Sequence, residues 1–358
     1  MTPKQRLLAA LSGRETDRVP WSPLLAYWWE AQPAGFQARG QLDFLEEIGA
    51  DPLLRGFHWL FSKHYNNCEY TTAQDGKYSR ITYKTPVGTL TCTHTYAERS
   101  NSWFLTEHPV KTGEDLKTLI YLYENMSIKP DYGKFVEDHA AIRERGLYVP
   151  IIGAEYKTSF QSLIEYWVGT EELVFMIEDY GELVDECVDL MQAKSLETAV
   201  ISVDTPAEAF IFWEDSSTLN VSPAQFRKYT APEIERWSAL VKQVGKILIH
   251  HACGSLKHLL PDMVKTGIDS IDSISPPPTG DIGISDALDL LPGTIGIIGG
   301  IEPTVMLNTT PAELRGHVYD LIQTVTAKTK RFILANSDSC PPGVEIEKFR
   351  LISEIVRS

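Results

Sequence analysis

The sequence predicts an α/β fold, a (β/α)8 TIM barrel in one domain over residues 1–358, with a small antiparallel β insertion near residues 64–110. First, strand-like and helix-like segments alternate, which is typical of a parallel sheet. Second, the number of strands approaches eight, which favours a closed barrel over the alternative, an open doubly wound sheet. Third, residues 64–110 break the alternation, because they are rich in Thr and Tyr and carry hairpin turn signals.

The predicted elements follow one another along the chain. The strands are expected at 18–27, 147–156, 206–215, 245–254, 268–275, 293–301 and 331–336. The helices are expected at 3–12, 41–50, 158–199, 222–243, 255–267, 285–291, 311–328 and 345–358.

Composition narrows the class of protein. The formal net charge of -15 argues against nucleic acid and anionic membranes as partners. The N-terminus does not resemble a signal peptide, and the chain contains no run of about eighteen apolar residues. Five cysteines in 358 residues form an odd and sparse set that does not resemble a disulfide framework. We therefore expect a reducing, cytoplasmic location.

The segment HHACG, residues 250–254, suggests a metal site. Side chains alternate along a strand, so His251 and Cys253 share one face at the carboxyl end of their strand, where barrel enzymes place their chemistry. Cys340 follows the last predicted strand, so it would lie at the same end of the barrel. One imidazole and two thiolates suit Zn(II), and three ligands leave a fourth position open. The alternative is that each cysteine is a small buried hydrophobe.

Other polar and aromatic side chains are expected near strand ends. Among the acidic residues, Glu155 and Asp215 are the preferred pair for proton transfer, although each could instead cap a helix or form an ion pair. The aromatic residues could line a pocket for a planar substrate, or simply fill the core. The candidates for substrate binding are Tyr27, Trp28, Trp29, Tyr156 and Trp213.

Several motifs resemble the uroporphyrinogen decarboxylase superfamily, in the expected order over essentially the whole chain. They are TPKQRLLAALSGRETDRVPW, TPVGTL, HHACG, GIDSI, GGIEP with TPAELR, and NSDSCPPG. The resemblance implies a (β/α)8 barrel and one of two chemistries. The decarboxylases use an arginine-rich segment after the first strand, whereas PLLAYWWEAQPAGF has no arginine before Arg39. The cobalamin-dependent methyltransferases carry H-x-C and a later Cys as zinc ligands, which His251, Cys253 and Cys340 match.

The resemblance implies a zinc-dependent methyltransferase. The favoured reaction moves a methyl group from a small methyl donor, preferably an aryl methyl ether, to a Co(I) corrinoid. The corrinoid (cobalamin) is expected on a separate protein, because no cobalamin-binding motif is recognisable in the chain. A methylcorrinoid:thiol methyltransferase uses the same ligands and stays open as the alternative. A decarboxylase and a non-catalytic corrinoid-binding protein rank below both.

Overall fold

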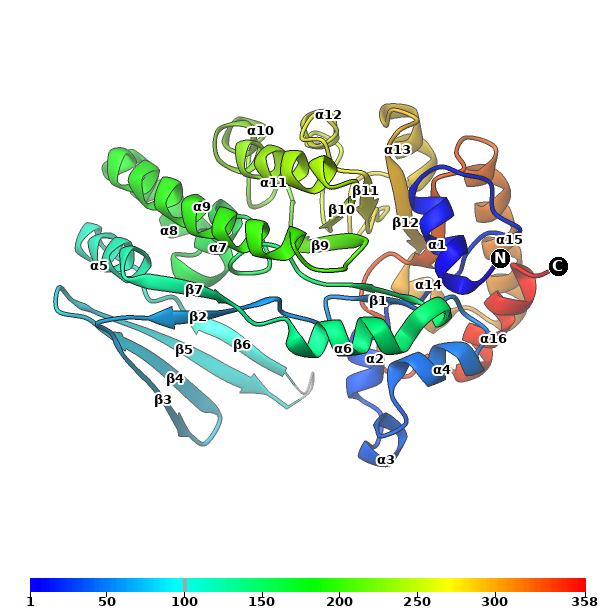
Figure 1. The fold of residues 1–358 in the computed structure, drawn as a ribbon, viewed down its shortest axis with the longest axis horizontal. Helices are drawn as coiled ribbons and strands as arrows, with labels where there is room; N and C mark the ends of the chain where they lie inside the picture. The colour runs from blue at the N-terminus through cyan, green and yellow to red at the C-terminus, as the bar shows by residue number, and fades with distance from the viewer. Residues whose placement is uncertain (99–101) are drawn as a thin grey trace. The chain divides into compact units, whose positions relative to one another are not determined.

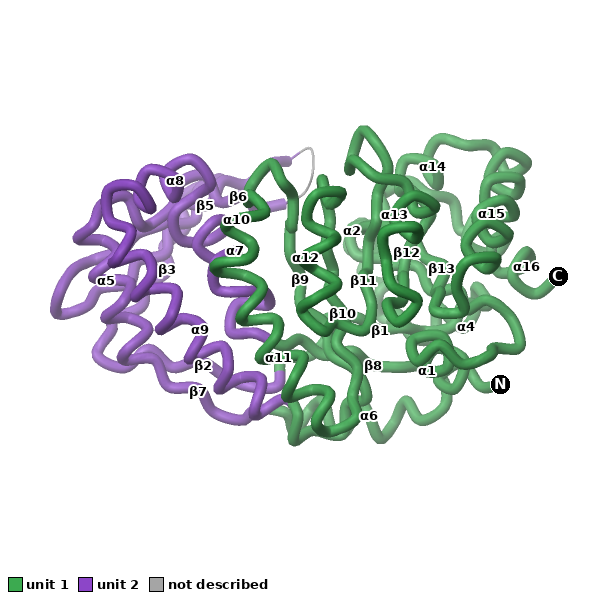
Figure 2. The backbone as a smooth tube through the Cα atoms, turned by 90° about the horizontal axis from the view of Figure 1, so that it is seen from above, with its two compact units in different colours: residues 1–59, 132–152, 203–358 green, residues 60–131, 153–202 purple. Residues whose placement is uncertain are grey.

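The computed structural model describes residues 1–98 and 102–358, and the chain forms two compact units (Figure 2). Unit 1 comprises residues 1–59, 132–152 and 203–358, and unit 2 comprises residues 60–131 and 153–202. The predicted single domain stays a prediction. No helix in the described ranges is long and apolar enough to cross a membrane.

Unit 1 is built on parallel strands. Five of them pair in the order β13–β12–β11–β10–β9, and β1 pairs with β8. The bounds are β1 Leu53–Arg55, β8 Leu147–Val149, β9 Ala209–Glu214, β10 Ile247–Ala252, β11 Ser270–Asp272, β12 Gly296–Ile301 and β13 Phe332–Asn336. The six predicted strands from residue 147 onward are therefore present, although most are shorter than expected.

Two isolated bridges connect further segments to the strands of unit 1. Ile151 bridges Ile211 in β9, and Trp21 bridges Leu334 in β13, both in parallel. The Asp51 amide donates to the Trp21 carbonyl at 2.7 Å, which ties this first segment to the start of β1. Eight parallel segments thus follow one another around unit 1, as the predicted (β/α)8 barrel requires.

The first strand is shorter than predicted. The expected strand at 18–27 is reduced to the bridge at Trp21, and residues Ala26–Glu30 form helix α2 instead. Pro20 and Pro23 flank the bridge. Proline has no backbone N–H to donate to a ladder, so this segment cannot pair along its length.

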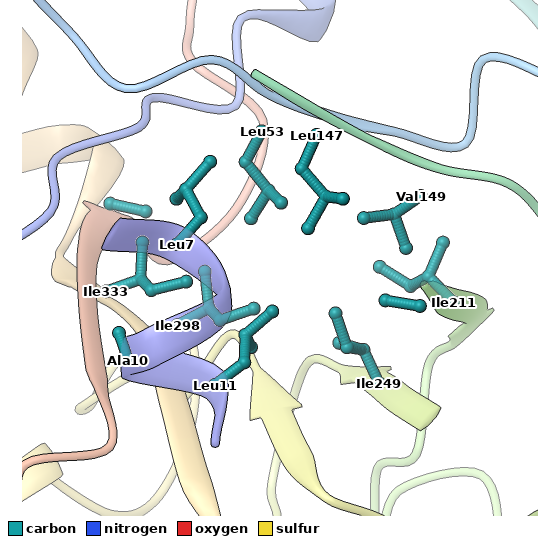
Figure 3. Close-up of a cluster of buried hydrophobic side chains, with 12 residues drawn as sticks. Leu7, Ala10, Leu11, Leu53, Leu147, Val149, Ile211, Ile249, Ile298 and Ile333 are labelled. Carbon is teal, nitrogen blue, oxygen red and sulfur yellow. The ribbon is translucent and has the colours of Figure 1, made fainter. Parts of the chain in front are cut away.

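The interior of unit 1 is a ring of aliphatic side chains (Figure 3). Ile211 of β9, Ile249 of β10 and Ile298 of β12 face one another there. Helix α1, Pro3–Leu11, adds Leu7, Ala10 and Leu11 to the same cluster. A capping box between Thr2 and Gln5 starts this helix by satisfying free backbone amides at its N-terminus.

Helices surround the strands of unit 1 (Figure 1). They are α3 Ala34–Gln37, α4 Gln41–Glu47, α6 Gly133–Ile142, η1 Arg143–Arg145, α10 Pro223–Gln225, η3 Phe226–Thr230, α11 Ala231–Gln243, α12 Leu260–Met263, α13 Ile284–Leu290, α14 Pro303–Asn308, α15 Pro311–Thr326 and α16 Ile346–Ile355. The helices predicted at 41–50, 285–291, 311–328 and 345–358 are α4, α13, α15 and α16.

Unit 2 contains the predicted antiparallel insertion. Its four-stranded sheet has the order β3–β4–β5–β6, and β2 pairs with β7. The bounds are β2 Phe61–Tyr65, β3 Glu69–Asp75, β4 Tyr78–Lys84, β5 Thr89–Ala97, β6 Ser102–Glu107 and β7 Met126–Pro130. Its helices are α5 Gly113–Glu124, α7 Ser159–Ser162, the π-helix η2 Leu163–Trp167, α8 Thr170–Asp179 and α9 Gly181–Val203. Residues 99–101 of the insertion lie outside the described residues.

Candidate active site at the carboxyl ends of the barrel strands

Three neighbouring strands place Trp213, His251 and Asp272 in register at one end of unit 1. The His251 ring lies 4.4 Å from the Trp213 ring, centroid to centroid. Its Nδ1 atom lies 3.6 Å from Oδ2 of Asp272. The same carboxylate oxygen accepts a hydrogen bond of 2.8 Å from Arg55, which ends β1. A chain of contacts therefore runs from β1 through Asp272 to His251.

The Asp272 carboxylate is charged although it is fully buried. Burial by itself raises the pKa of Asp272, but the nearby Arg55 charge and the proximity of the His251 ring outweigh that effect and leave the pKa below its usual value. Removing Arg55 would leave this charge uncompensated in the interior, which is costly.

Several buried polar atoms at this end have no hydrogen-bond partner within the protein. They are Arg55 Nε, His251 Nδ1, Asp272 Oδ1, Ser273 Oγ, Ser275 Oγ and Glu302 Oε2. Each unsatisfied buried group costs roughly 1–3 kcal/mol, so such groups seldom gather where nothing binds. Their concentration indicates a place for water, an ion or a substrate.

His250 has a different environment from His251, as the alternation of side chains predicts. Its ring stacks on Phe212 with centroids 4.3 Å apart, and its Nε2 lies 3.1 Å from Ser216 Oγ. Phe212 in turn packs against Trp237 of α11. Burial lowers the pKa of His250 and keeps its ring neutral. These contacts make His250 a packing residue. His251 instead lies on the same face of the strand as the inward-facing Ile249.

The two predicted cysteine ligands also belong to unit 1. Cys253 follows β10, and its Sγ lies 3.6 Å from the Glu214 carbonyl oxygen. The Cys340 amide donates to Leu24 O at 2.9 Å, and the Cys340 carbonyl accepts from Trp28 N at 2.8 Å. These bonds fix the segment after β13 against the segment after Trp21. Burial raises the pKa of the Cys340 thiol to about 12.

One imidazole and two thiols are suitable donors for Zn(II), and the unpartnered Nδ1 of His251 beside a carboxylate fits a metal-binding histidine. Within residues 1–98 and 102–358, no group of three or more His, Cys, Asp or Glu side chains is gathered so that it could hold a metal ion. The zinc ligand set therefore stays a prediction.

A cavity of about 280 Å³ lies beside this cluster in unit 1. Arg55, Gly56 and Trp213 line it, together with Leu24, Ala26, Glu30, Gln41, Phe57 and Ser339. Gly56 has a φ of +76°, and a Cβ atom there would lie 2.9 Å from Trp213 Nε1. Glycine therefore allows Trp213 to approach the chain closely, and a side chain at this position would displace it.

The preferred acidic pair is divided between the units. Asp215 of unit 1 accepts a hydrogen bond of 2.8 Å from Asn220. Glu155 of unit 2 accepts from Lys63 at 2.7 Å and from Tyr123 at 3.1 Å. Each carboxylate is thus held in place within its own unit, and their joint role in catalysis stays a prediction.

The predicted substrate-binding aromatic residues have varied surroundings. Trp28 is buried, stacks on Phe44 with centroids 5.1 Å apart, and donates from Nε1 to the Val344 carbonyl. Trp29 is buried beside the same ring, whereas Tyr27 is exposed. This packing gives the two tryptophans a structural role. Trp213 lines the small cavity, and Tyr156 lines a larger cavity in unit 2.

Sequence reasoning missed Arg55 as a functional residue. The strand that it ends is three residues long, which is too short to show a clear period. Asp272 was not among the predicted site residues either. The useful signal was the position of Asp272 at the end of a buried strand next to the strand that carries His251.

The fold and this cluster define a barrel protein whose unsatisfied polar groups gather at the carboxyl ends of its strands. The family described as uroporphyrinogen decarboxylase (URO-D) matches residues 98–358, and the chain belongs to this family. The resemblance inferred from the motifs is therefore confirmed at the level of the superfamily.

Solved structures resemble the chain at low sequence identity. A methyltransferase from Methanosarcina mazei is 13% identical, with a TM-score of 0.64, and the match covers 100% of this chain and 98% of that one. A dihydropteroate synthase from Anaplasma phagocytophilum is 14% identical, with a TM-score of 0.32, covering 48% of this chain and 67% of that one. No curated protein matches. The first likeness supports the fold over the full length.

Proposed function

We propose that this protein is a zinc-dependent methyltransferase that moves a methyl group from a small methyl donor to a Co(I) corrinoid on a separate protein. An aryl methyl ether is the favoured donor. Family membership and the full-length likeness to a methyltransferase fold support an enzyme of this general type. The metal, the corrinoid partner, the donor and the cytoplasmic location belong to the proposal.

The observation that carries the proposal is the orientation of His251. Its Nδ1 faces the Asp272 carboxylate at 3.6 Å, and Arg55 holds that carboxylate at 2.8 Å. Metal-binding histidines commonly turn one ring nitrogen toward a carboxylate, which fixes the ring and leaves the other nitrogen for the ion. Cys253 and Cys340 would supply the remaining protein ligands.

A bound Zn(II) would supply Lewis-acid stabilisation of the negative charge that develops on the leaving group, which can contribute several kcal/mol. The residues of the chain would hold and orient the donor. The cavity of about 280 Å³ suits a small molecule. Trp213 lines this cavity and also packs against the His251 ring. Asp215 and Glu155 are the proposed groups for proton transfer.

The arginines near the first strands disfavour decarboxylation of a polycarboxylate. Arg55 is buried and already paired with Asp272, and Arg39 is paired with Glu47. Neither guanidinium is therefore a free binding group for a substrate carboxylate. These paired arginines favour the proposed methyltransferase over the decarboxylase that gives the family its name.

Zinc analysis of the purified protein tests the metal assignment. The parent chain should contain stoichiometric zinc, and Cys340→Ala should lose it because one of three ligands is removed. Cys187→Ala is the matched control, since Cys187 is also a buried free cysteine but lies in α9 of unit 2. Equal zinc in Cys340→Ala and the control, or none in the parent, contradicts the assignment.

An anaerobic assay with a reduced corrinoid protein tests the reaction. Demethylation of a methoxylated aromatic compound supports the proposed direction, with methylated amines and sulfides run in parallel. Transfer from methylcorrinoid to a small thiol, without demethylation, would instead support the thiol methyltransferase, in which zinc holds a thiolate. Corrinoid binding without turnover would contradict an enzymatic role.

A further inference from the structure

Unit 2 contains a cavity of about 860 Å³. Six large aromatic side chains line it: Tyr65, Tyr70, Tyr83, Tyr156, Tyr166 and Trp167. The volume is near the upper end of the range that binds drug-sized molecules, so it exceeds what one aromatic ring needs.

The aromatic residues form a connected surface. Tyr83 of β4 lies 5.2 Å from Tyr70, 5.7 Å from Tyr65 and 5.6 Å from Trp167, centroid to centroid. These rings come from β2, β3, β4 and η2, so separate elements of unit 2 present them to one cavity. Aromatic rings arranged in this way favour stacked or edge-on contact with another flat ring.

The charges around the cavity are balanced. Lys63 contacts Glu155 at 2.7 Å, which pairs the lysine and the glutamate of the lining with each other. Burial lowers the pKa of His94, which keeps its imidazole neutral. Burial also raises the pKa of Tyr83 and of Tyr166, so their phenols stay protonated. An isolated charge on a ligand would therefore find no unpaired counter-charge among these groups.

One further feature points to a ligand. Tyr156 has a φ of +65°, which is strained for a bulky residue, and such strain is concentrated at binding and catalytic sites.

We propose that this cavity of unit 2 binds a flat, uncharged ligand that has more than one aromatic ring. The aromatic surface supplies stacking, and the paired charges select a neutral molecule. Every residue that lines the cavity belongs to unit 2, and binding is tested without methyl transfer.

Calorimetric titration of the full chain, without corrinoid protein, tests the ligand class. The probes are methoxynaphthalene, naphthalene, naphthoate and a trimethylammonium-substituted naphthalene, which share two rings. The two neutral probes should bind most tightly. The anion and the cation should bind at least about tenfold more weakly, because each would bury an unpaired charge.

Variants of exposed tyrosines test the position of the site with little risk to folding. Tyr70→Leu should weaken the binding of methoxynaphthalene by about 2- to 10-fold, as expected for the loss of one aromatic contact. Tyr78→Leu is the matched control, because Tyr78 is similarly exposed on the same sheet but does not line the cavity. Its affinity should equal that of the parent.

The absence of binding by methoxynaphthalene, tighter binding of a charged probe, or equal losses in Tyr70→Leu and Tyr78→Leu would overturn the proposal.

Discussion

Each end of the barrel strands in unit 1 contains a fully buried aspartate that is paired with arginine. The two aspartates differ in how many of their carboxylate oxygens accept a hydrogen bond. Asp51 precedes β1, and Asp272 ends β11. Asp51 accepts hydrogen bonds from Arg6 at 2.5 Å and Arg18 at 2.9 Å through Oδ1, and from the Trp21 amide at 3.1 Å through Oδ2. Both carboxylate oxygens of Asp51 are therefore occupied.

At the opposite end, the network around Asp272 is incomplete. Asp272 Oδ2 accepts from Arg55, while Asp272 Oδ1 and Arg55 Nε have no partner in the protein. Residues at the amino ends of barrel strands usually serve stability, whereas those at the carboxyl ends serve chemistry. The two aspartates therefore differ in the satisfaction of their hydrogen-bonding groups, and not in burial or charge.

The largest effect is expected at the amino end. Asp51→Ala should lower the free energy of unfolding by about 3–5 kcal/mol, because it leaves Arg6 and Arg18 without their shared carboxylate. Denaturant unfolding measures this loss, and zinc content should stay that of the parent. Asp43→Ala is the control, since Asp43 forms an exposed pair with Arg145. A loss no greater than that of the control would contradict the structural role.

At the carboxyl end we expect a smaller effect, on zinc affinity instead of the free energy of unfolding. On the proposed zinc assignment, Asp272→Asn should weaken zinc binding by about 10- to 100-fold, because it removes the carboxylate that orients His251. Competition with a chromogenic chelator measures the affinity. Asp262→Asn is the control, because Asp262 pairs with Lys265 and Arg227 away from His251. Unchanged zinc affinity in Asp272→Asn would remove the functional distinction between the two ends.

The smallest effect is expected at Asp17, which borders the amino-end network. Its hydrogen bonds to Arg6 lower the pKa of Asp17 below its usual value. A lowered pKa means that the stabilisation is present above the unfolded-state pKa of about 3.9 and is lost as the pH falls below it. Asp17 is partly exposed, so we expect less than about 1 kcal/mol at neutral pH.

Unfolding of Asp17→Asn and of the parent at neutral and acidic pH measures this contribution. The difference in the free energy of unfolding should be largest at neutral pH and should shrink below about pH 4. A difference that grows on acidification would show that the sign of the expected linkage is wrong.

Much of the fold could be predicted because it depends on local periodicity. The two-residue period separates His250 from His251, and the structure gives them the different environments that this period implies. The strand Leu53–Arg55 was missed because three residues cannot establish a period. The predicted strand at 18–27 was too long because its prolines limit pairing, an effect that an apolar pattern does not reveal.

The candidate sites were less predictable because they depend on contacts between distant residues. Arg55 meets Asp272 across 217 positions of sequence, and no local pattern signals that pair. The lining of the cavity in unit 2 likewise brings together Tyr65 and Trp167, which are distant in sequence. Sequence reasoning identified Tyr156 as a substrate-binding candidate, but it had no means of assigning this residue to a cavity lined by the antiparallel sheet.

The interior position of helix α1 has a consequence for the order of folding. Leu7 belongs to the same hydrophobic cluster as Ile333 and Ala335 of β13, and Arg331 donates to the Leu11 carbonyl at 2.8 Å. These contacts join residues more than three hundred positions apart, and such long-range closure slows folding. Helix α1 therefore cannot complete its packing before β13 is in place, so the core of unit 1 closes late in folding.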